Sequence, residues 1–233
     1  MKHRSRIPVK VPRLAGMARP RTYDDALRTR LLEVASRTIS ERGEGGVTVR
    51  SVAAASGTSP SAVYALFGSR EKLVEAVTAE GFRRFAAHLA AAGRSDDPGR
   101  DLLALGLAYR ASALDDPHFY RVMFERRGAV AEGAGYDGGA DDAGPVAGSR
   151  AADPGDPAIP PAETFEVLRD AVARVLPAEA PAGHAETVAI GLWGLAHGLV
   201  SLELAGLLDG DAGTRERRYT EIMSSLGPQL AAF

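Results

Sequence analysis

The chain has 233 residues, 45% of them hydrophobic, so it can bury a sizeable core and hold a small domain beside a larger one. It has no cysteine, which excludes disulfides, thiolate metal sites and cysteine-dependent catalysis. Residues 1–94 contain 17 Lys and Arg against 8 Asp and Glu, whereas residues 95–233 contain 11 against 22. The basic part is the expected surface for nucleic acid, because cationic side chains release counterions from phosphates.

The first 21 residues carry seven basic side chains and no acidic one. Their apolar residues follow no helical period, so residues 1–21 are expected to form a disordered basic arm. Such an arm could follow a phosphate backbone or be a plain flexible extension. The arm lacks the continuous apolar run of a secretory signal, which predicts a cytoplasmic protein. The sequence leaves open whether Met1 or Met17 is the natural start.

A first helix is predicted from Thr22, because Thr22 and Asp25 have the spacing of a capping box. Glycines at positions 43, 45 and 46 end this helix. Its apolar residues recur on one face, which predicts that this face covers the elements that follow. These residues are Leu27, Leu31, Val34, Ala35 and Ile39.

Two short helices joined by a tight turn are predicted in residues 47–73. Thr48 can cap the first helix, and Gly57 can adopt the left-handed backbone that a sharp turn requires. Ser59 followed by Pro60 begins the second helix, because a serine hydroxyl can cap it and proline suits its first position. Such a pair predicts a helix-turn-helix, whose second helix enters the DNA major groove.

This segment carries the pattern A-x-x-x-G-x-S-x-x-x-x-Y-x-x-F-x-x-[KR]-x-x-L between Ala53 and Leu73. The pattern resembles the DNA-binding domain of TetR-family transcriptional regulators. Leu66 stands where that family often has histidine, and Arg70 where it usually has lysine for a backbone phosphate. The small side chains of the second helix would let it sink into the groove. The residues expected to contact DNA are Thr48, Arg50, Thr58, Ser59, Ser61, Ala62, Tyr64 and Arg70.

The remainder of the chain predicts further helices separated by one long polar segment. Residues 128–161 are dominated by Gly, Ala, Asp and Pro, so we expect a mobile loop there. The apolar helix predicted over 184–208 nearly reaches membrane-spanning length, but its glycines, His197 and Glu203 favour a helix that protein covers on several sides. The helices are expected from Ser69, over 98–114, from Pro117, over 161–176, over 184–208 and over 214–232.

Trp193, His197 and Gly198 form the motif W-x-x-x-H-G within the apolar helix. This motif resembles the effector domain of a TetR subfamily named for its Trp-His-Gly motif, and residues 116–124 are similar to that subfamily's preceding helix. Two interpretations stay open: Trp193 and His197 pack at a subunit interface, with the histidine hydrogen-bonded, or they line an inducer pocket. In the second case the ligand-binding residues are Phe119, Met123, Phe165, Trp193 and His197.

The sequence therefore predicts an all-α fold of about nine helices, with no cofactor, metal or membrane. Residues 22–68 form the three-helix DNA-binding domain, and residues 69–233 form a helical ligand-binding and dimerisation domain. The resemblance implies a ligand-responsive regulator, most simply a repressor that binds a palindromic operator as a homodimer through its last two helices. It also implies a bacterial cytoplasmic protein that joins the nucleoid when bound to DNA, and a small-molecule inducer of unknown identity.

The sequence leaves two other function classes open. A helical adaptor whose helix-turn-helix has lost DNA binding would show no salt-dependent binding to duplexes. An enzyme would need a base, for which His118 and His197 are the candidates. The five histidines are scattered without ligand spacing, and no nucleophile, base and acid set is visible. We therefore expect no catalytic residue.

Overall fold

The computed structural model describes residues 21–124 and 161–225. These residues form nine α-helices and one short 3-10 helix, without a strand, so the all-α prediction is confirmed. The predicted arm over 1–21, except Arg21, the predicted loop over 128–161, except Pro161, and the last residues of the final predicted helix lie outside this part. Those predictions stay predictions. Arg21 and Pro161 are the first residues of helices.

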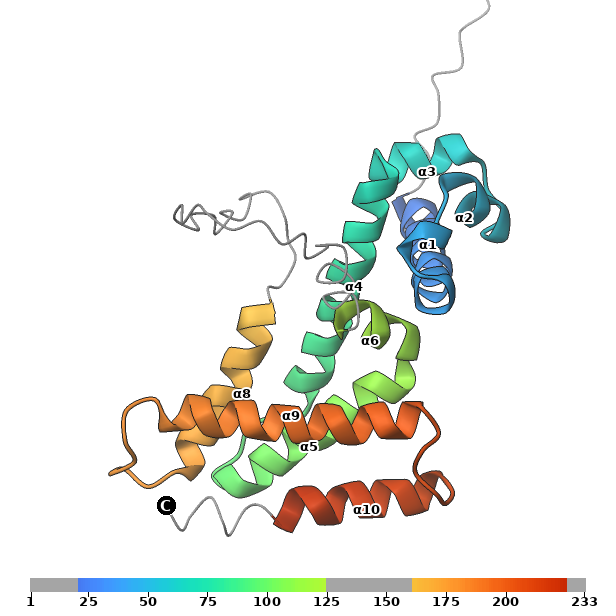
Figure 1. Ribbon diagram of the computed structural model, residues 1–233. Coiled ribbons are helices and arrows are strands. Elements are labelled where there is room, and N and C mark those ends of the chain that lie inside the picture. The colour runs from blue at the N-terminus through green and yellow to red at the C-terminus, as the bar shows by residue number, and fades with distance from the viewer. Residues whose placement is uncertain (1–20, 125–160, 226–233) are drawn as a thin grey trace, which may run out of the picture.

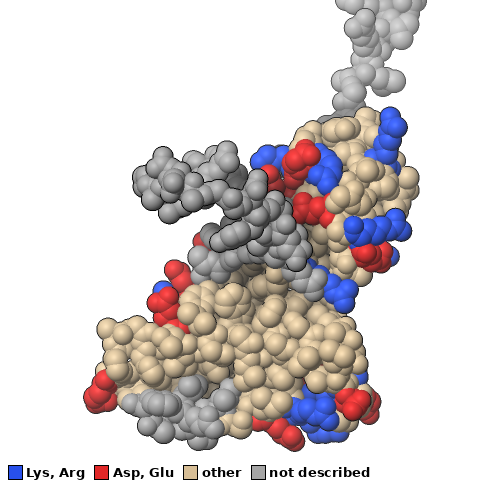
Figure 2. Space-filling model, in the orientation of Figure 1, with Lys and Arg blue, Asp and Glu red and all other residues tan. Residues whose placement is uncertain are grey.

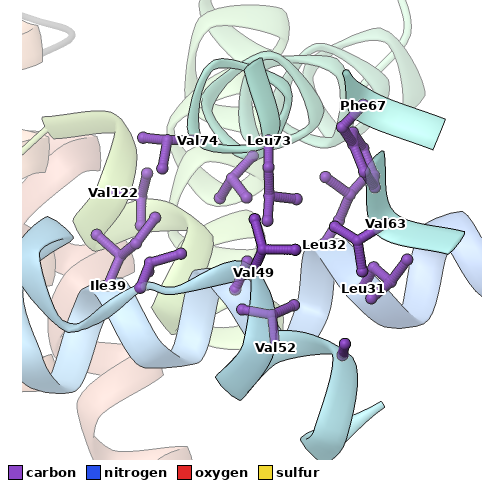
Figure 3. Packing of buried hydrophobic residues seen from close by; sticks show 14 of the residues in the cluster. Leu31, Leu32, Ile39, Val49, Val52, Val63, Phe67, Leu73, Val74 and Val122 are labelled. Atoms are coloured by element: carbon purple, nitrogen blue, oxygen red, sulfur yellow. The ribbon is translucent and has the colours of Figure 1, made fainter. Parts of the chain in front are cut away.

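The N-terminal helices form a compact head at one end of the long helix α4 (Figure 1). Buried aliphatic side chains from all of these helices meet in one core, shown in Figure 3. Leu31 of the first helix and Leu73 of the fourth are fully buried there. The elements of the head are α1 (Arg21–Arg42), η1 (Glu44–Gly46), α2 (Val49–Ala55), α3 (Pro60–Phe67) and the first turns of α4 (Arg70–Ala91).

Helix α4 belongs to two hydrophobic cores. Its N-terminal half contributes Leu73, Val74 and Val77 to the core of the head. Its C-terminal half contributes Phe82 and Phe85 to the core of the second domain. A helix of 22 residues is about 33 Å long at ~1.5 Å per residue. A displacement at one end of α4 therefore moves the other end as well.

The second domain contains the five remaining helices (Figure 1). Asp97 caps the first of them through a 3.0 Å hydrogen bond from the Arg100 amide. The long apolar helix ends at Leu204, four residues before its predicted end, because a turn at Gly206 follows. These helices are α5 (Pro98–Asp115), α6 (Pro117–Phe124), α8 (Pro161–Val175), α9 (His184–Leu204) and α10 (Ala212–Ser225).

Helix α6 is buried on both sides and joins the two cores. Phe119 and Val122 belong to the core of the head, whereas Tyr120 and Met123 belong to the core of the second domain. The helix packs against α1 and against α4. It approaches α4 closely at Gly81, where an added Cβ would lie 2.8 Å from the Cγ and Sδ atoms of Met123. Glycine permits this approach because it has no side chain.

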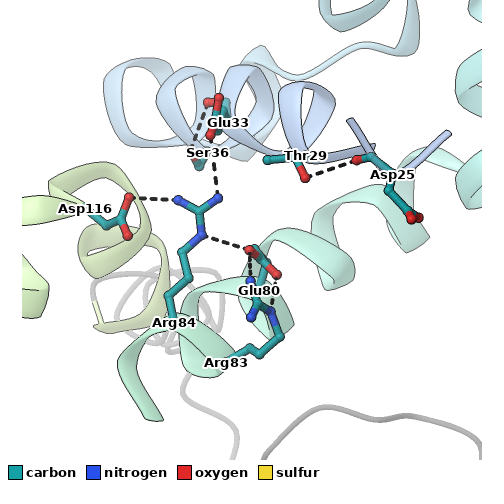
Figure 4. A network of polar contacts seen from close by, with 8 residues as sticks. All are labelled: Asp25, Thr29, Glu33, Ser36, Glu80, Arg83, Arg84 and Asp116. Atoms are coloured by element: carbon teal, nitrogen blue, oxygen red, sulfur yellow. Dashed lines mark hydrogen bonds and ion pairs between the residues drawn. The ribbon is translucent and has the colours of Figure 1, made fainter. Parts of the chain in front are cut away.

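A network around Arg84 of α4 holds the joint between the domains (Figure 4). Its Nε donates to Glu80 at 2.8 Å, and its Nη1 donates to Asp116 at 2.9 Å. The guanidinium also lies 3.6 Å from a carboxylate oxygen of Glu33 in α1 and 4.4 Å from the ring centroid of Phe119. Burial alone would raise the pKa of Glu80, but the hydrogen bonds from two arginines outweigh it and lower that pKa. The network thus fastens α1, α4 and the start of α6 together.

Helix α9 is more open in this chain than its sequence predicted. It is the one helix in the described ranges that is long and apolar enough to cross a membrane by length and composition. Only 22% of its most apolar window is buried, so the prediction of cover on several sides is wrong for the isolated subunit. The helix packs against α5, α8 and α10, and the Glu203 carboxylate near its end receives two 2.8 Å hydrogen bonds from Arg110. Ile190 and Leu202 remain exposed on this helix.

An acidic side chain fastens α8 to the start of α5. Asp101 accepts hydrogen bonds from the amide and hydroxyl of Ser95, and from Nη1 of Arg174 at 2.7 Å. The Ser95 hydroxyl, its amide and the Arg174 guanidinium together lower the pKa of Asp101 to about 2. Arg174 also donates to the Ser95 carbonyl at 2.8 Å, which closes the contact between α8 and the α4–α5 connection.

We predict that Asp101→Asn lowers the midpoint of thermal unfolding at pH 7 by about 2 to 4 °C. The pKa of Asp101 is lower in the folded than in the unfolded chain, so its stabilisation is complete above the ordinary value of 3.8 and is lost as pH falls toward about 2. The difference between the variant and the parent should therefore shrink over that window in calorimetric scans. The exposed neighbour Asp96, changed to Asn, is the control. A difference that stays constant with pH would contradict this role.

Candidate nucleic-acid interface and ligand cavity

The sequence of α3 explains why one face of this helix is buried and the other is open. The Ser59 hydroxyl accepts a 3.2 Å hydrogen bond from the Ala62 amide, and Pro60 occupies the first turn. Val63 and Phe67 anchor the helix in the head, as their spacing predicted. Gly68 ends the helix with a φ of 78°, a conformation that other residues rarely adopt.

Ser61 and Tyr64, two predicted DNA contacts of α3, lie on its exposed side, whereas Ala62 also packs against the core of the head. The Tyr64 side chain is 53% exposed, although it is large and aromatic. Ser59 and Ser61 are exposed and their hydroxyl oxygens lie 2.9 Å apart, whereas Thr58 and Ala62 are half-buried. The structure thus brings these five predicted residues together along one short stretch of surface.

Helix α2 is held by a reciprocal cap that the sequence only partly predicted. The Thr48 hydroxyl accepts from the Ser51 amide at 3.0 Å, as expected for a cap. The Ser51 hydroxyl in turn accepts from the Thr48 amide at 3.2 Å, a role that glutamate or glutamine usually fills. Thr48 and Arg50 are both exposed at this end of α2. Gly57 makes the turn into α3 with a φ of 65°.

Arg70 has contacts that its predicted role did not include. Its Nε donates to the Val47 carbonyl at 2.8 Å, and its Nη2 donates to the Glu44 carbonyl. Its Nη1 lies 3.6 Å from the Glu71 carboxylate. The guanidinium therefore braces the start of α4 against the connection between α1 and α2. Arginine in place of lysine was the available signal, because a planar guanidinium can donate to two carbonyls at once.

A cavity of about 750 Å³ lies between α4, α5, α8 and α9, with the end of α6 in its wall. Four of the five predicted ligand-binding residues line it: Met123, Phe165, Trp193 and His197. The fifth prediction is wrong, because Phe119 is packed in the core of the head beneath Arg84. Helix α6 crosses α4 near Gly81, so its first turn lies over the head rather than over the cavity.

Aromatic side chains form a continuous part of the cavity wall. The ring centroids of Trp193 and Phe165 lie 6.0 Å apart, and those of Trp193 and Phe124 lie 6.3 Å apart. Phe124 also contacts Phe85 of α4, with an edge-to-face geometry at 6.2 Å. Phe124 and Phe85 were not predicted to contact a ligand, because helical spacing alone cannot distinguish a core position from a cavity wall.

A small polar cluster interrupts this apolar wall. Nδ1 of His197 lies 2.7 Å from the Tyr120 hydroxyl and 3.1 Å from the Tyr109 hydroxyl. The two hydroxyls lie 3.3 Å apart. Burial next to Tyr120 raises the pKa of Tyr109, so Tyr109 remains a protonated hydroxyl at neutral pH. His197 therefore both lines the cavity and is hydrogen-bonded, which combines features of the two interpretations of its motif.

The second candidate base, His118, lies away from this cavity. Its Nδ1 is 3.2 Å from the Ser40 hydroxyl, between α6 and α1. Burial lowers the pKa of His118, and Arg37 and Arg121 add to this effect. His118 is not among the residues that line the cavity and belongs to the joint between the domains.

Comparison with known proteins identifies both parts of the chain. A model of the bacterial regulatory proteins of the tetR family matches residues 31–77, and a model of the Tetracyclin repressor-like C-terminal domain matches residues 102–226. The HTH-type transcriptional regulator BetI of Brucella anthropi is 36% identical over 96 residues. That match covers 40% of this chain and 49% of BetI, so the chain spans about half the length of this curated relative.

Solved structures share the fold over most of their length. A TetR-like transcriptional regulator from Rhodococcus sp. RHA1 matches with a TM-score of 0.61 at 16% identity, covering 91% of this chain and 97% of that one. The TetR family regulator PfmR from Thermus thermophilus matches with a TM-score of 0.56 at 16% identity, covering 86% and 97%. The Trp-His-Gly subfamily is not shown by these matches. Because the C-terminal model alone covers more than half of the sequence, the chain belongs to the TetR family of bacterial transcriptional regulators.

Proposed function

We propose that this chain is a ligand-responsive repressor that binds a palindromic operator as a homodimer in the bacterial cytoplasm. The observation that carries the proposal is the outer side of α3, where small polar side chains and Tyr64 stand exposed on a helix anchored from behind. A helix with this profile fits the major groove, which is about 12 Å wide. A repressor needs no covalent chemistry, because ligand binding has only to change the positions of the repressor's DNA-binding heads.

Different exposed residues would contact the bases and the phosphates of the DNA. Ser61 and Ala62, near the N-terminus of α3, would meet base edges, since the first residues of a recognition helix lie deepest in the groove. Thr48 and Arg50 of α2, together with Tyr64, would contact backbone phosphates on either side. Phosphate contacts position the protein without reading sequence. Arg70 would act through its brace, by fixing the α1–α2 connection that presents Thr48.

The open face of α9 supports dimerisation. Ile190 is 53% exposed and Leu202 is 41% exposed on this helix. A Cβ added at Gly191 or Gly198 would meet no atom within 4 Å, so another helix could approach closely there. Figure 2 shows that the surface over α9 is a broad area without Lys, Arg, Asp or Glu. Two copies joined through α9 and α10 would place two α3 helices on one operator, about 34 Å apart.

The joint between α6 and α4 supplies a route from ligand to DNA. Met123 lines the cavity and also packs directly on Gly81 of α4. Phe119, one turn earlier in α6, is part of the head core. A ligand that displaces Met123 would therefore act on α4 and on the head together. The ligand can shift the equilibrium between two conformations of the protein only as far as its affinities for the two conformations differ.

Binding to duplex DNA tests the proposal directly. A duplex selected in vitro should bind the full chain with a strong dependence on salt, and Arg50→Gln should weaken binding and reduce the salt slope by about 1. Tyr64→Phe should weaken binding by about 1 kcal/mol, the value of one hydrogen bond. Arg94→Gln, an equal charge change at an exposed position between α4 and α5, is the control and should leave both unchanged. A parent chain without salt-dependent binding would favour the adaptor alternative.

A second prediction concerns the joint. Gly81→Ala should destabilise the protein by about 1 to 3 kcal/mol, because the new Cβ overlaps with Met123. It should also change operator affinity in the absence of ligand. Met123→Ala should remove the overlap, so Gly81→Ala should cost less stability and change operator affinity less in a Met123→Ala background than in the parent, which denaturant unfolding and mobility-shift titrations can measure. Gly213→Ala is the control, since its Cβ would make an ordinary 3.5 Å contact. Additive effects of the two substitutions would contradict the proposed route.

A further inference from the structure

The cavity wall offers no buried counterion among the residues that the structure describes. Apart from His197, whose Nδ1 already contacts two tyrosine hydroxyls, the acidic and basic residues in its lining are Asp97 and Arg100, and both are exposed at the N-terminus of α5. Asp97 is already engaged, since its carboxylate caps α5. A charged group deep in the cavity would lose its hydration without gaining a partner of opposite charge. Such burial is costly, so the wall disfavours ions.

The aromatic residues favour a flat ring system. The ring planes of Phe165 and Phe124 are inclined to Trp193 by 53° and 58°. A ring lying against them would meet both faces and edges, the arrangements that aromatic pairs prefer. Met123 and Met223 also line the cavity, and their flexible thioethers adapt to the outline of a guest. The volume of about 750 Å³ suits a molecule of two or three rings.

The polar cluster marks one place for a hydrogen bond. Tyr109 and His197 line the cavity, with Tyr120 bonded to His197 behind them. Each phenolic oxygen has one hydrogen to donate and two lone pairs to accept with. Trp193 also makes a side-chain hydrogen bond with Tyr109. A guest that donates or accepts one hydrogen bond can exchange with one of the contacts of this hydroxyl, and an ion is not needed to satisfy the cluster.

Resting on the proposed function, we propose that the effector is an uncharged, mostly apolar ring compound that carries one hydroxyl or carbonyl group. Its rings lie against Trp193, Phe165 and Phe124. Its polar group reaches the cluster of Tyr109 and His197. Binding displaces Met123, which connects this ligand chemistry to the joint with α4.

Four matched probes test the charge and polarity of this site. They share the biphenyl ring system: biphenyl, 4-phenylphenol, biphenyl-4-carboxylate and the 4-biphenyl trimethylammonium ion. Trp193 is the one tryptophan of the chain and lines the cavity, so its emission reports occupancy, with calorimetry as a second measurement. We expect 4-phenylphenol to bind at least tenfold more tightly than either ion and about threefold more tightly than biphenyl. A charged probe that binds as tightly, or the absence of binding by all four, would overturn the proposal.

A conservative variant tests the polar cluster separately. Tyr109→Phe removes one hydroxyl and should abolish the preference for 4-phenylphenol over biphenyl, while biphenyl binding persists and confirms that the cavity has formed. Tyr219→Phe is the matched control, because its buried hydroxyl donates to the Gly106 carbonyl at 2.8 Å and Tyr219 does not line the cavity. A preference that survives Tyr109→Phe would show that the cluster does not recognise the polar group.

Duplex binding in the same preparation separates the two proposals. A parent chain that binds the selected duplex but follows the wrong order of probe affinities contradicts only the ligand class. A parent chain that binds probes in the expected order but binds no duplex contradicts the repressor function and leaves the ligand class supported.

Discussion

The architecture depends on one constraint, which is that a single helix takes part in two hydrophobic cores. Leu73 and Val77 bind α4 to the head, and Phe82 and Phe85 bind it to the second domain. Packed cores do not deform continuously, so a change in one core must be met by repacking or by a rigid shift of the shared helix. Helix α6 adds a second connection beside it, and Arg84 ties the two connections to α1. DNA recognition and ligand binding can thus be coupled without a flexible hinge.

Much of this arrangement was predictable from local signals. Serine and threonine before the short helices, and glycine at the turns, identify their own positions because each satisfies a local backbone requirement. Contacts between distant residues gave no such signal. The brace from Arg70 to Val47, the packing of Phe119 in the head and the meeting of His197 with two tyrosines depend on how the helices are assembled. Sequence therefore predicted the helix-turn-helix well and predicted which residues line the cavity only in part.

The composition of α9 follows from two demands on the same helix. Trp193 and His197 face a cavity that needs apolar and aromatic walls, whereas Gly191 and Gly198 stand in open space where a second helix can approach. Neither side tolerates charge, which explains why the helix has the hydropathy of a membrane span. The buried pair of Glu203 and Arg110 fixes its C-terminal end and accounts for the charge at that end. Ligand binding and the proposed pairing of subunits therefore make compatible demands on one sequence.

The central claim is that two heads are held at a separation that α4 sets and that ligand changes. A chain without cysteine allows a single spin label at Glu75→Cys, an exposed position on α4 beside the head. The distance between labels in the two subunits can then be measured by pulsed electron resonance in the free protein, with the selected duplex, and with 4-phenylphenol. The account predicts one narrow intersubunit distance on the duplex and a shifted, broader distribution with the probe. The absence of an intersubunit distance, or the same distribution in all three states, would contradict it.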